Sequence, residues 1–169
     1  TTFPPKNWTM IDGDGDGNNW KQGTVANNFA FTNNNSLGSA YSESWKNPSA
    51  LTPNNYLITP AIDLSAAGTS IKLSYFVVAE DPAFAAEHYK VVVSNKGNTK
   101  ADFDATGTIV LEETLANTTF QERTIDLSSF SGDTIYVAWI HYNVTDMFRM
   151  TIDDIKVYEP GVYAHDAAL

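Results

Sequence analysis

The chain has 169 residues, no cysteine and a formal net charge of −10, with a pI near 4.5. The length predicts one domain, which we expect to span residues 1–159, followed by a C-terminal tail or linker at residues 160–169. The lack of cysteine excludes a disulfide scaffold, a thiolate metal site and a cysteine nucleophile. The acidity argues against nucleic acid and anionic membranes as partners, and no apolar run of about 18 residues predicts membrane insertion.

Short segments rich in β-branched and aromatic residues, separated by Gly, Asn, Pro and Asp, predict strands along most of the chain. In chain order they are residues 8–11, 29–31, 41–45, 56–58, 71–79, 89–95, 108–115, 121–127, 134–142 and 150–158. Several alternate with period two, and residues 81–88 could form one helical turn at most. This pattern predicts an all-β fold, a two-sheet antiparallel jelly-roll β-sandwich.

The first acidic motif is Asp-Gly-Asp-Gly-Asp-Gly-Asn at residues 12–18. Alternate carboxylates on a flexible loop, here Asp12, Asp14 and Asp16 with Asn18 beyond them, are the oxygen ligands that Ca²⁺ prefers. The alternative is a solvated turn, because Asp-Gly steps are common in turns. A helix–loop–helix calcium site would need a bidentate Glu at the twelfth position, which here is Gly23. The missing ligands must therefore come from elsewhere in the fold.

A second acidic motif lies in the last predicted strand. Strand alternation places Asp153 on the face of Ile155 and Val157, which should be the core face, and Asp154 on the opposite face. A carboxylate in a dry core is costly unless it is paired or binds a metal. We therefore expect Asp153 or Asp154 to complete the calcium site of the first motif. A strand bulge would exchange the two, and a plain acidic pair at a sheet end is the alternative.

A third acidic segment, residues 80–89, connects two predicted strands. It has carboxylates at both ends and small residues between them, so Asp81 and Glu87 could hold a second Ca²⁺ together with main-chain oxygens. The alternative is a surface loop with acidic ends. We expect His88 to pack at the start of the next strand, because calcium takes oxygen ligands.

No motif in the sequence requires catalysis. The paired carboxylates are all sequence neighbours, and neighbours on a strand point to opposite faces, so they cannot flank one glycosidic bond. The three histidines show no metal-ligand spacing, and no nucleophile elbow or phosphate-binding loop occurs. Some tryptophans could stack on sugars, but we expect most of the four to lie in the core, namely Trp8, Trp20, Trp45 and Trp139.

Five blocks, in this order and spacing, resemble the cleaved adhesin domain family, known from the haemagglutinin/adhesin regions attached to gingipain proteases. The blocks are WTMIDGDGDGNNW at 8–20, LTPNNYLITP at 51–60, AEHYKV at 86–91, HYNVTDMF at 141–148 and IDDI at 152–155. The resemblance covers residues 8–158. One departure concerns residues 1–7, which lack the acidic, aromatic strand that often opens family members, so one calcium ligand could be absent or replaced.

The resemblance implies a jelly roll with structural calcium, secreted or displayed on the bacterial surface as one of several modules of a larger polyprotein. It also implies binding to host surface or matrix proteins, cells or glycans, without enzymatic activity. We therefore expect a calcium-stabilised adhesin module with one or two Ca²⁺. The alternative is a carbohydrate-binding module of an extracellular glycan-degrading enzyme, and a third possibility is a structural spacer.

Overall fold

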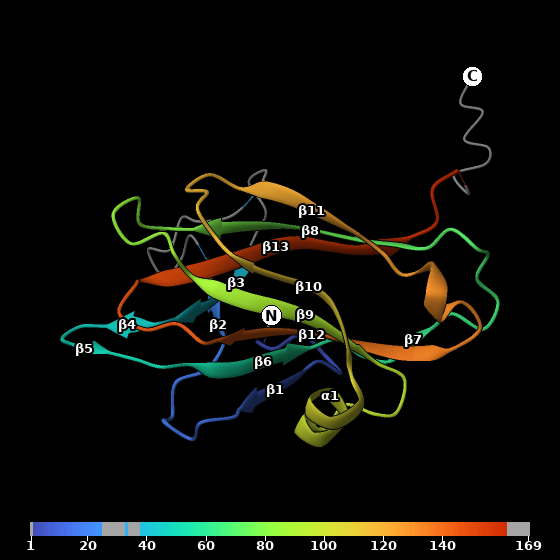
Figure 1. Cartoon of the computed structure of the whole chain (residues 1–169), viewed down its shortest axis with the longest axis horizontal. Helices are drawn as coiled ribbons and strands as arrows, with labels where there is room; N and C mark the ends of the chain where they lie inside the picture. The colour runs from blue at the N-terminus through green and yellow to red at the C-terminus, as the bar shows by residue number, and fades with distance from the viewer. Residues whose placement is uncertain (1, 25–32, 34–37, 162–169) are drawn as a thin grey trace.

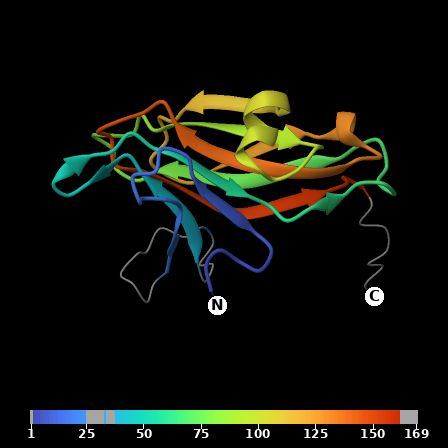
Figure 2. The same cartoon turned by 90° about the horizontal axis from the view of Figure 1, so that it is seen from below.

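The structure, a computed structural model, describes residues 2–24, 33 and 38–161. Two antiparallel sheets form a sandwich (Figures 1 and 2). Sheet I has the order β1-β6-β12-β9-β10, with β7 also paired to β12, and sheet II has the order β11-β8-β13-β3-β2. The strands of sheet I are β1 (Thr9–Asp12), β6 (Asn54–Ile58), β7 (Ile62–Asp63), β9 (His88–Ser94), β10 (Thr108–Thr114) and β12 (Thr134–Tyr142).

Sheet II contains β2 (Lys21–Gly23), β3 (Ser39–Glu43), β8 (Lys72–Ala79), β11 (Gln121–Asp126) and β13 (Arg149–Tyr158). A two-stranded hairpin of β4 (Trp45–Lys46) and β5 (Ser49–Ala50) projects from one end of the sandwich (Figure 1). The predicted two-sheet antiparallel sandwich is confirmed. The predicted strand at residues 29–31 lies outside the described residues.

The core lies between the sheets, and strand alternation correctly predicts the inward faces of β8 and β12. Leu73, Tyr75 and Val77 of β8 are fully buried, as is Trp139 of β12. The ring of Trp139 contacts Tyr75 edge-on with centroids 5.4 Å apart, and it stacks on Trp8 at 6.4 Å. Burying large side chains of this kind contributes roughly 1.5–3 kcal/mol each.

One helix, which the sequence patterns do not predict, covers the outer face of sheet I. It is α1 (Lys100–Thr106), and a capping box between Thr99 and Asp102 begins it. Phe103, the buried residue of α1, packs on the outward side chains of sheet I, forming a second cluster with Tyr56, Ile58, Val92, Ala138 and Ile140. Sheet I is therefore buried on both faces beneath α1 (Figure 2). A short 3-10 turn, η3 (Ser128–Phe130), follows β11.

Candidate functional site

The acidic loop (residues 12–18) begins at Asp12, the last residue of β1, and turns back on that side chain. One carboxylate oxygen of Asp12 accepts the N–H of Gly15 at 2.8 Å, and the other accepts the N–H of Gly17 at 2.9 Å. Gly15 has a φ of +75°, a conformation that costs glycine little and L-residues more. The loop is thus folded around its first carboxylate.

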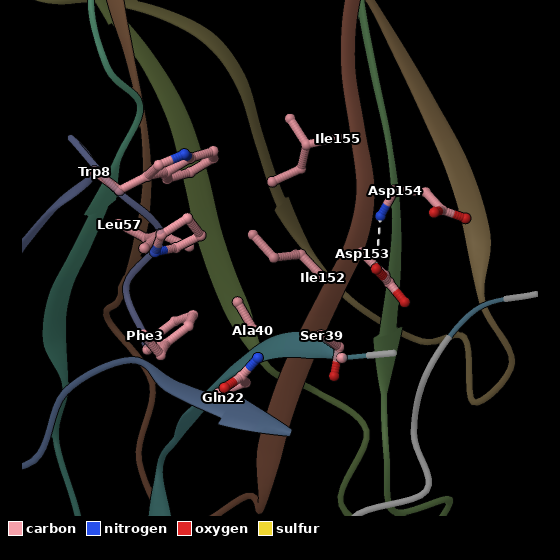
Figure 3. A pocket seen from close by; sticks show the side chains of 12 residues that line it. Phe3, Trp8, Gln22, Ser39, Ala40, Leu57, Ile152, Asp153, Asp154 and Ile155 are labelled. Atoms are coloured by element: carbon pink, nitrogen blue, oxygen red, sulfur yellow. Dashed lines mark hydrogen bonds between the residues drawn. The ribbon is translucent and has the colours of Figure 1, made fainter. Parts of the chain in front are cut away.

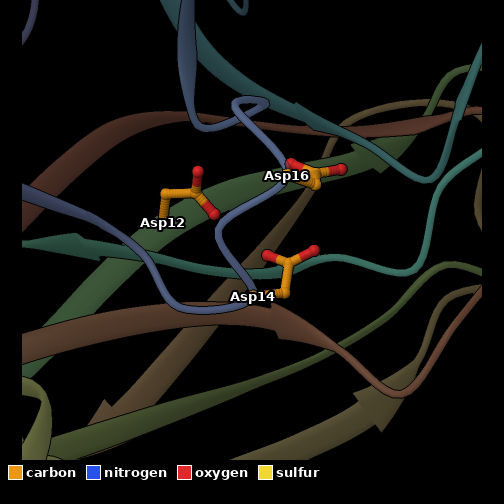
Figure 4. Close-up of side chains that lie close together, drawn as sticks. All are labelled: Asp12, Asp14 and Asp16. Carbon is orange, nitrogen blue, oxygen red and sulfur yellow. The ribbon is translucent and has the colours of Figure 1, made fainter.

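Three carboxylates gather in this loop (Figure 4). Each of Asp12, Asp14 and Asp16 has an oxygen within 4.8 Å of the other two, and Asp14 and Asp16 are exposed. Such a group of hard oxygen donors fits Ca²⁺, which takes six to eight oxygens at about 2.3–2.6 Å. The predicted clustering of these three side chains is confirmed, and whether a cation binds stays a prediction.

The three carboxylates of the loop carry like charges at close range, and this proximity affects their pKa values. Desolvation, together with repulsion from Asp16, raises the pKa of Asp14 above its usual value. Partial desolvation also acts to raise the pKa of Asp12, but the hydrogen bonds from Gly17 and Gly15 outweigh it and lower that pKa. A bound cation would offset the repulsion that Asp14 and Asp16 exert on each other.

Asn18 is engaged within the protein. Its backbone N–H and side-chain amide donate to the two carboxylate oxygens of Asp16, at 2.7 and 3.1 Å. Its side-chain oxygen accepts from Lys46 of the β4–β5 hairpin at 3.2 Å. Asp14 in turn accepts the N–H of Asn54, the first residue of β6. These contacts place the acidic loop beside the hairpin end of the sandwich.

The structure does not bring Asp153 or Asp154, the expected further ligands, to this cluster. Among the described residues, the group of carboxylates around Asp12 includes neither of them. Instead, Asn33 donates its backbone N–H to Asp153 at 2.8 Å and its side-chain amide to Asp154 at 3.0 Å.

Asp153 is buried, with 8% of its surface exposed, but it does not face the space between the sheets as predicted, because β13 contains a bulge. Its register against β8 shifts between Asp153 and Lys156, and Asp154 has a φ of +51°. As a result Ile152 and Ile155 both face the interior, while the Asp153 and Asp154 side chains point to the other side (Figure 3). These four residues line one hollow, next to Trp8 and Leu57.

The expected pairing of Asp81 with Glu87 is likewise not found. Glu87 is fully buried, and both of its carboxylate oxygens are bound within the protein. One oxygen accepts from the Ser44 hydroxyl and the Phe148 N–H, each at 2.9 Å, and the other lies 2.9 Å from His141. Asp81 instead lines a separate surface hollow. In this structure Glu87 is an internal hydrogen-bond acceptor, and the structure does not bring it together with Asp81.

This internal network joins three segments that the sequence patterns do not connect. The His141 ring lies 2.8 Å from the Ser42 hydroxyl, which also accepts from Asn55 at 3.1 Å. The order Ser42–His141–Glu87 resembles a nucleophile–base–acid chain, but all three side chains are fully buried, and a nucleophile must reach its substrate. The network instead fixes the ends of β3, β6 and β12. A signal for it existed in the EHY and HYN blocks, which contain Glu87 and His141.

Two stacked antiparallel sheets, with the acidic loop beside the β4–β5 hairpin at one end, define an antiparallel β-sandwich domain. No described helix is long and apolar enough to cross a membrane. The family model described as Cleaved Adhesin Domain matches residues 1–157, and the chain belongs to this family.

Curated relatives agree with this assignment. Hemagglutinin A of Porphyromonas gingivalis is 37% identical over 93% of this chain, and Gingipain R1 of the same species is 38% identical over 93%. The chain spans only 8% and 10% of the lengths of these two proteins. It is thus similar to one module of much larger chains.

Solved structures extend the similarity to three dimensions. The K1 cleaved adhesin domain of Lys-gingipain from Porphyromonas gingivalis W83 has a TM-score of 0.78 and 37% identity, with 93% of each chain covered. The xylan-binding domain from Paenibacillus barcinonensis has a TM-score of 0.53 at 11% identity over 92% of each chain, which shows a shared fold alone.

Proposed function

We propose that this domain is a non-catalytic, calcium-stabilised adhesin module, secreted or displayed on a bacterial surface, which binds host proteins or glycans. Its membership of the cleaved adhesin family and its 37–38% identity to haemagglutinin and gingipain modules support the adhesin role. Since those relatives are far longer than this chain, neighbouring modules are part of the proposal.

The observation that supports calcium is the preorganised acidic loop. Asp12 is already held by two backbone N–H groups, and Asp14 and Asp16 lie within reach of the same point. We propose these three carboxylates as the protein side-chain ligands of one loop site, because they lie together while Glu87 and Asp153 lie elsewhere. A cation here would tie the loop to the start of β6 and to the hairpin, and so stiffen the end of the sandwich.

A thermal melt of chelator-stripped protein tests the metal. At a hundredfold excess of Ca²⁺ over Kd, one site adds about 2.7 kcal/mol, a shift of several degrees for a domain of this size. We expect the shift with Ca²⁺ and not with Mg²⁺, and we expect Asp14→Asn with Asp16→Asn to abolish it. Asp153→Asn is the matched control, because it removes a carboxylate outside the loop. An unchanged melt of verifiably metal-free protein would refute the calcium part.

The adhesin part has its own test. Immobilised protein is probed with erythrocytes, with matrix and plasma proteins, and with a glycan array. If the domain binds proteins and no glycan on the array, the result supports the adhesin function. Reproducible binding to glycans supports the alternative, a carbohydrate-binding module. Against that alternative, Phe103 of α1 packs over Ile58 and Ile140, so this part of the outer face of sheet I is not open to a flat sugar chain.

A further inference from the structure

A surface hollow lies at the same end of the sandwich as the β4–β5 hairpin. It has a volume of about 290 Å³ and is lined by residues from three segments, the hairpin and the loops 80–87 and 143–148. We call it the aromatic hollow, and its lining residues are Trp45, Asp81, Phe84, Asp146, Met147 and Phe148. It contains no residue of the acidic loop.

Three of the lining side chains are aromatic. Trp45 and Phe148 lie in contact, with ring centroids 6.1 Å apart and planes tilted by 52°. Phe84 is 48% exposed, one of two large hydrophobic side chains on the described surface that are so open. Exposing a phenylalanine beside two other partly open aromatic rings is costly for a monomer, and such patches mark binding surfaces.

The other feature of the hollow is uncompensated negative charge. Asp81 and Asp146 come from opposite loops, and among the described residues neither forms an ion pair with a basic side chain. Asp81 accepts the N–H of Ala83, which orients its carboxylate. Two carboxylates beside aromatic faces attract a cation with a flat or apolar body.

The protein already shows this mode of contact at the rim of the hollow. The guanidinium of Arg149 lies 4.6 Å from the centre of the Phe148 ring, and its charge is paired with Glu80. Phe148 therefore accepts a guanidinium on its face in this structure.

The hollow is held in shape from below by the buried network. Glu87 accepts the N–H of Phe148 and the hydroxyl of Ser44, and the N–H groups of Ser44 and Trp45 both donate to the Phe148 carbonyl. The backbone positions of Trp45 and Phe148 are thus fixed by hydrogen bonds before any ligand arrives. Preorganisation of this kind lowers the entropic cost of binding.

We propose that the aromatic hollow binds a basic side chain of a partner protein, and arginine above lysine. Arginine is favoured because its planar guanidinium stacks on aromatic rings and pairs with carboxylates at the same time. This proposal rests on the proposed adhesin function, and it names the kind of partner side chain that the adhesin would contact at this hollow. The net charge of −10 favours a basic partner surface for the same reason.

The test is an NMR titration that follows the indole N–H of Trp45. The probes are acetyl-Gly-Arg-Gly-amide, the same peptide with the neutral isostere citrulline, the lysine peptide, and xylohexaose. We expect a saturable shift of the Trp45 signal with arginine, weaker binding with lysine, and at least about fivefold weaker binding with citrulline. Asp81→Asn with Asp146→Asn should lower the arginine affinity by about three- to tenfold.

Two control variants separate the hollow from general surface effects. Glu122→Gln removes one exposed charge on β11, and Ile109→Ala removes the other exposed hydrophobic side chain, on β10. Both should leave arginine binding unchanged, whereas Phe84→Ala should weaken it. Equal binding of arginine and citrulline, or a Trp45 shift with xylohexaose alone, would overturn the proposal. If protein binding in the adhesin screen survives the double Asp variant unchanged, this hollow is not the contact, while the adhesin function stands.

Discussion

The carboxylate of Glu87 and the imidazole of His141 lie 2.9 Å apart, and both side chains are fully excluded from solvent. Glu87 directly precedes β9 and His141 lies at the end of β12. Glu87 also binds Ser44, just after β3, and His141 binds Ser42 within β3. This pair is the polar centre of the end of the sandwich at which the aromatic hollow lies. Its removal should affect stability and the shape of the hollow together.

Glu87→Ala should destabilise the domain by about 3–5 kcal/mol, because it leaves the buried donors of Ser44, Phe148 and His141 without their acceptor. Urea denaturation followed by tryptophan fluorescence measures the change. Glu122→Ala, which removes an exposed carboxylate from β11, is the control and should stay within about 0.5 kcal/mol of the parent. A cost for Glu87→Ala as small as that of the control would contradict the role given to the network.

Gly13→Ala should destabilise the acidic loop through a backbone clash. A Cβ at this position would lie 2.6 Å from the carbonyl oxygen of Asn54, which also accepts the N–H of Gly13. We expect a cost of about 1–3 kcal/mol in a thermal or urea melt. At Gly15 a Cβ would meet open space. Gly15→Ala should therefore lower the free energy of unfolding only by the cost of holding alanine at a positive φ, about 1 kcal/mol. Gly15→Asn should cost less than Gly15→Ala, and the reverse order would show that φ is not the constraint.

Phe103→Ala should loosen α1 from sheet I at a cost of about 3–5 kcal/mol, since Phe103 is 3% exposed and fills the space over Ile58 and Ile140. Hydrogen exchange should then speed up for the amides of α1 more than for those of β8 in sheet II. Ile109→Ala, on the open surface, is the matched control. Equal exchange in α1 and β8 would mean that the helix is held by other contacts.

Asp126 should make stability depend on pH in the acid range. The hydroxyl and N–H of Ser128, with Lys72, lower the pKa of Asp126 from 3.8 to about 2. A depressed carboxyl pKa contributes stability that is fully present above the unfolded value and is lost as pH falls from 3.8 to about 2. The stability difference between the parent and Asp126→Asn should therefore shrink across this window in urea melts. A difference that stays constant from pH 5 to pH 2 would contradict this assignment.

The sequence predicts the local features of this fold well. The period-two patterns of β8 and β12 correctly predict which side chains face the core, and the spacing of Asp12, Asp14 and Asp16 predicts that they cluster. Both depend on neighbours within a few residues. α1 was missed because seven residues give too short a hydrophobic stripe, although the Thr99–Asp102 capping box is a start signal.

The sequence fails where distant segments meet. A single bulge in β13 interrupts the alternation of side chains along the strand. Counting alternate residues back from Val157 therefore places Asp153 on the wrong face. The partners of Glu87 are likewise 43, 54 and 61 residues away along the chain, in segments that no pattern links to it. Such contacts are set by how the sheets stack, which periodicity does not report.

The edge of sheet I at β10 affects whether neighbouring copies of such a module, held close together on one chain, could pair strand to strand. The edge strand β10 bears a register shift between Ile109 and Leu111, followed by Glu112 and Glu113. A regular, uncharged edge would offer a template onto which a neighbouring copy could add its own strand. The kink and the two acids disfavour such edge-to-edge growth, so high local concentration need not lead to fibres.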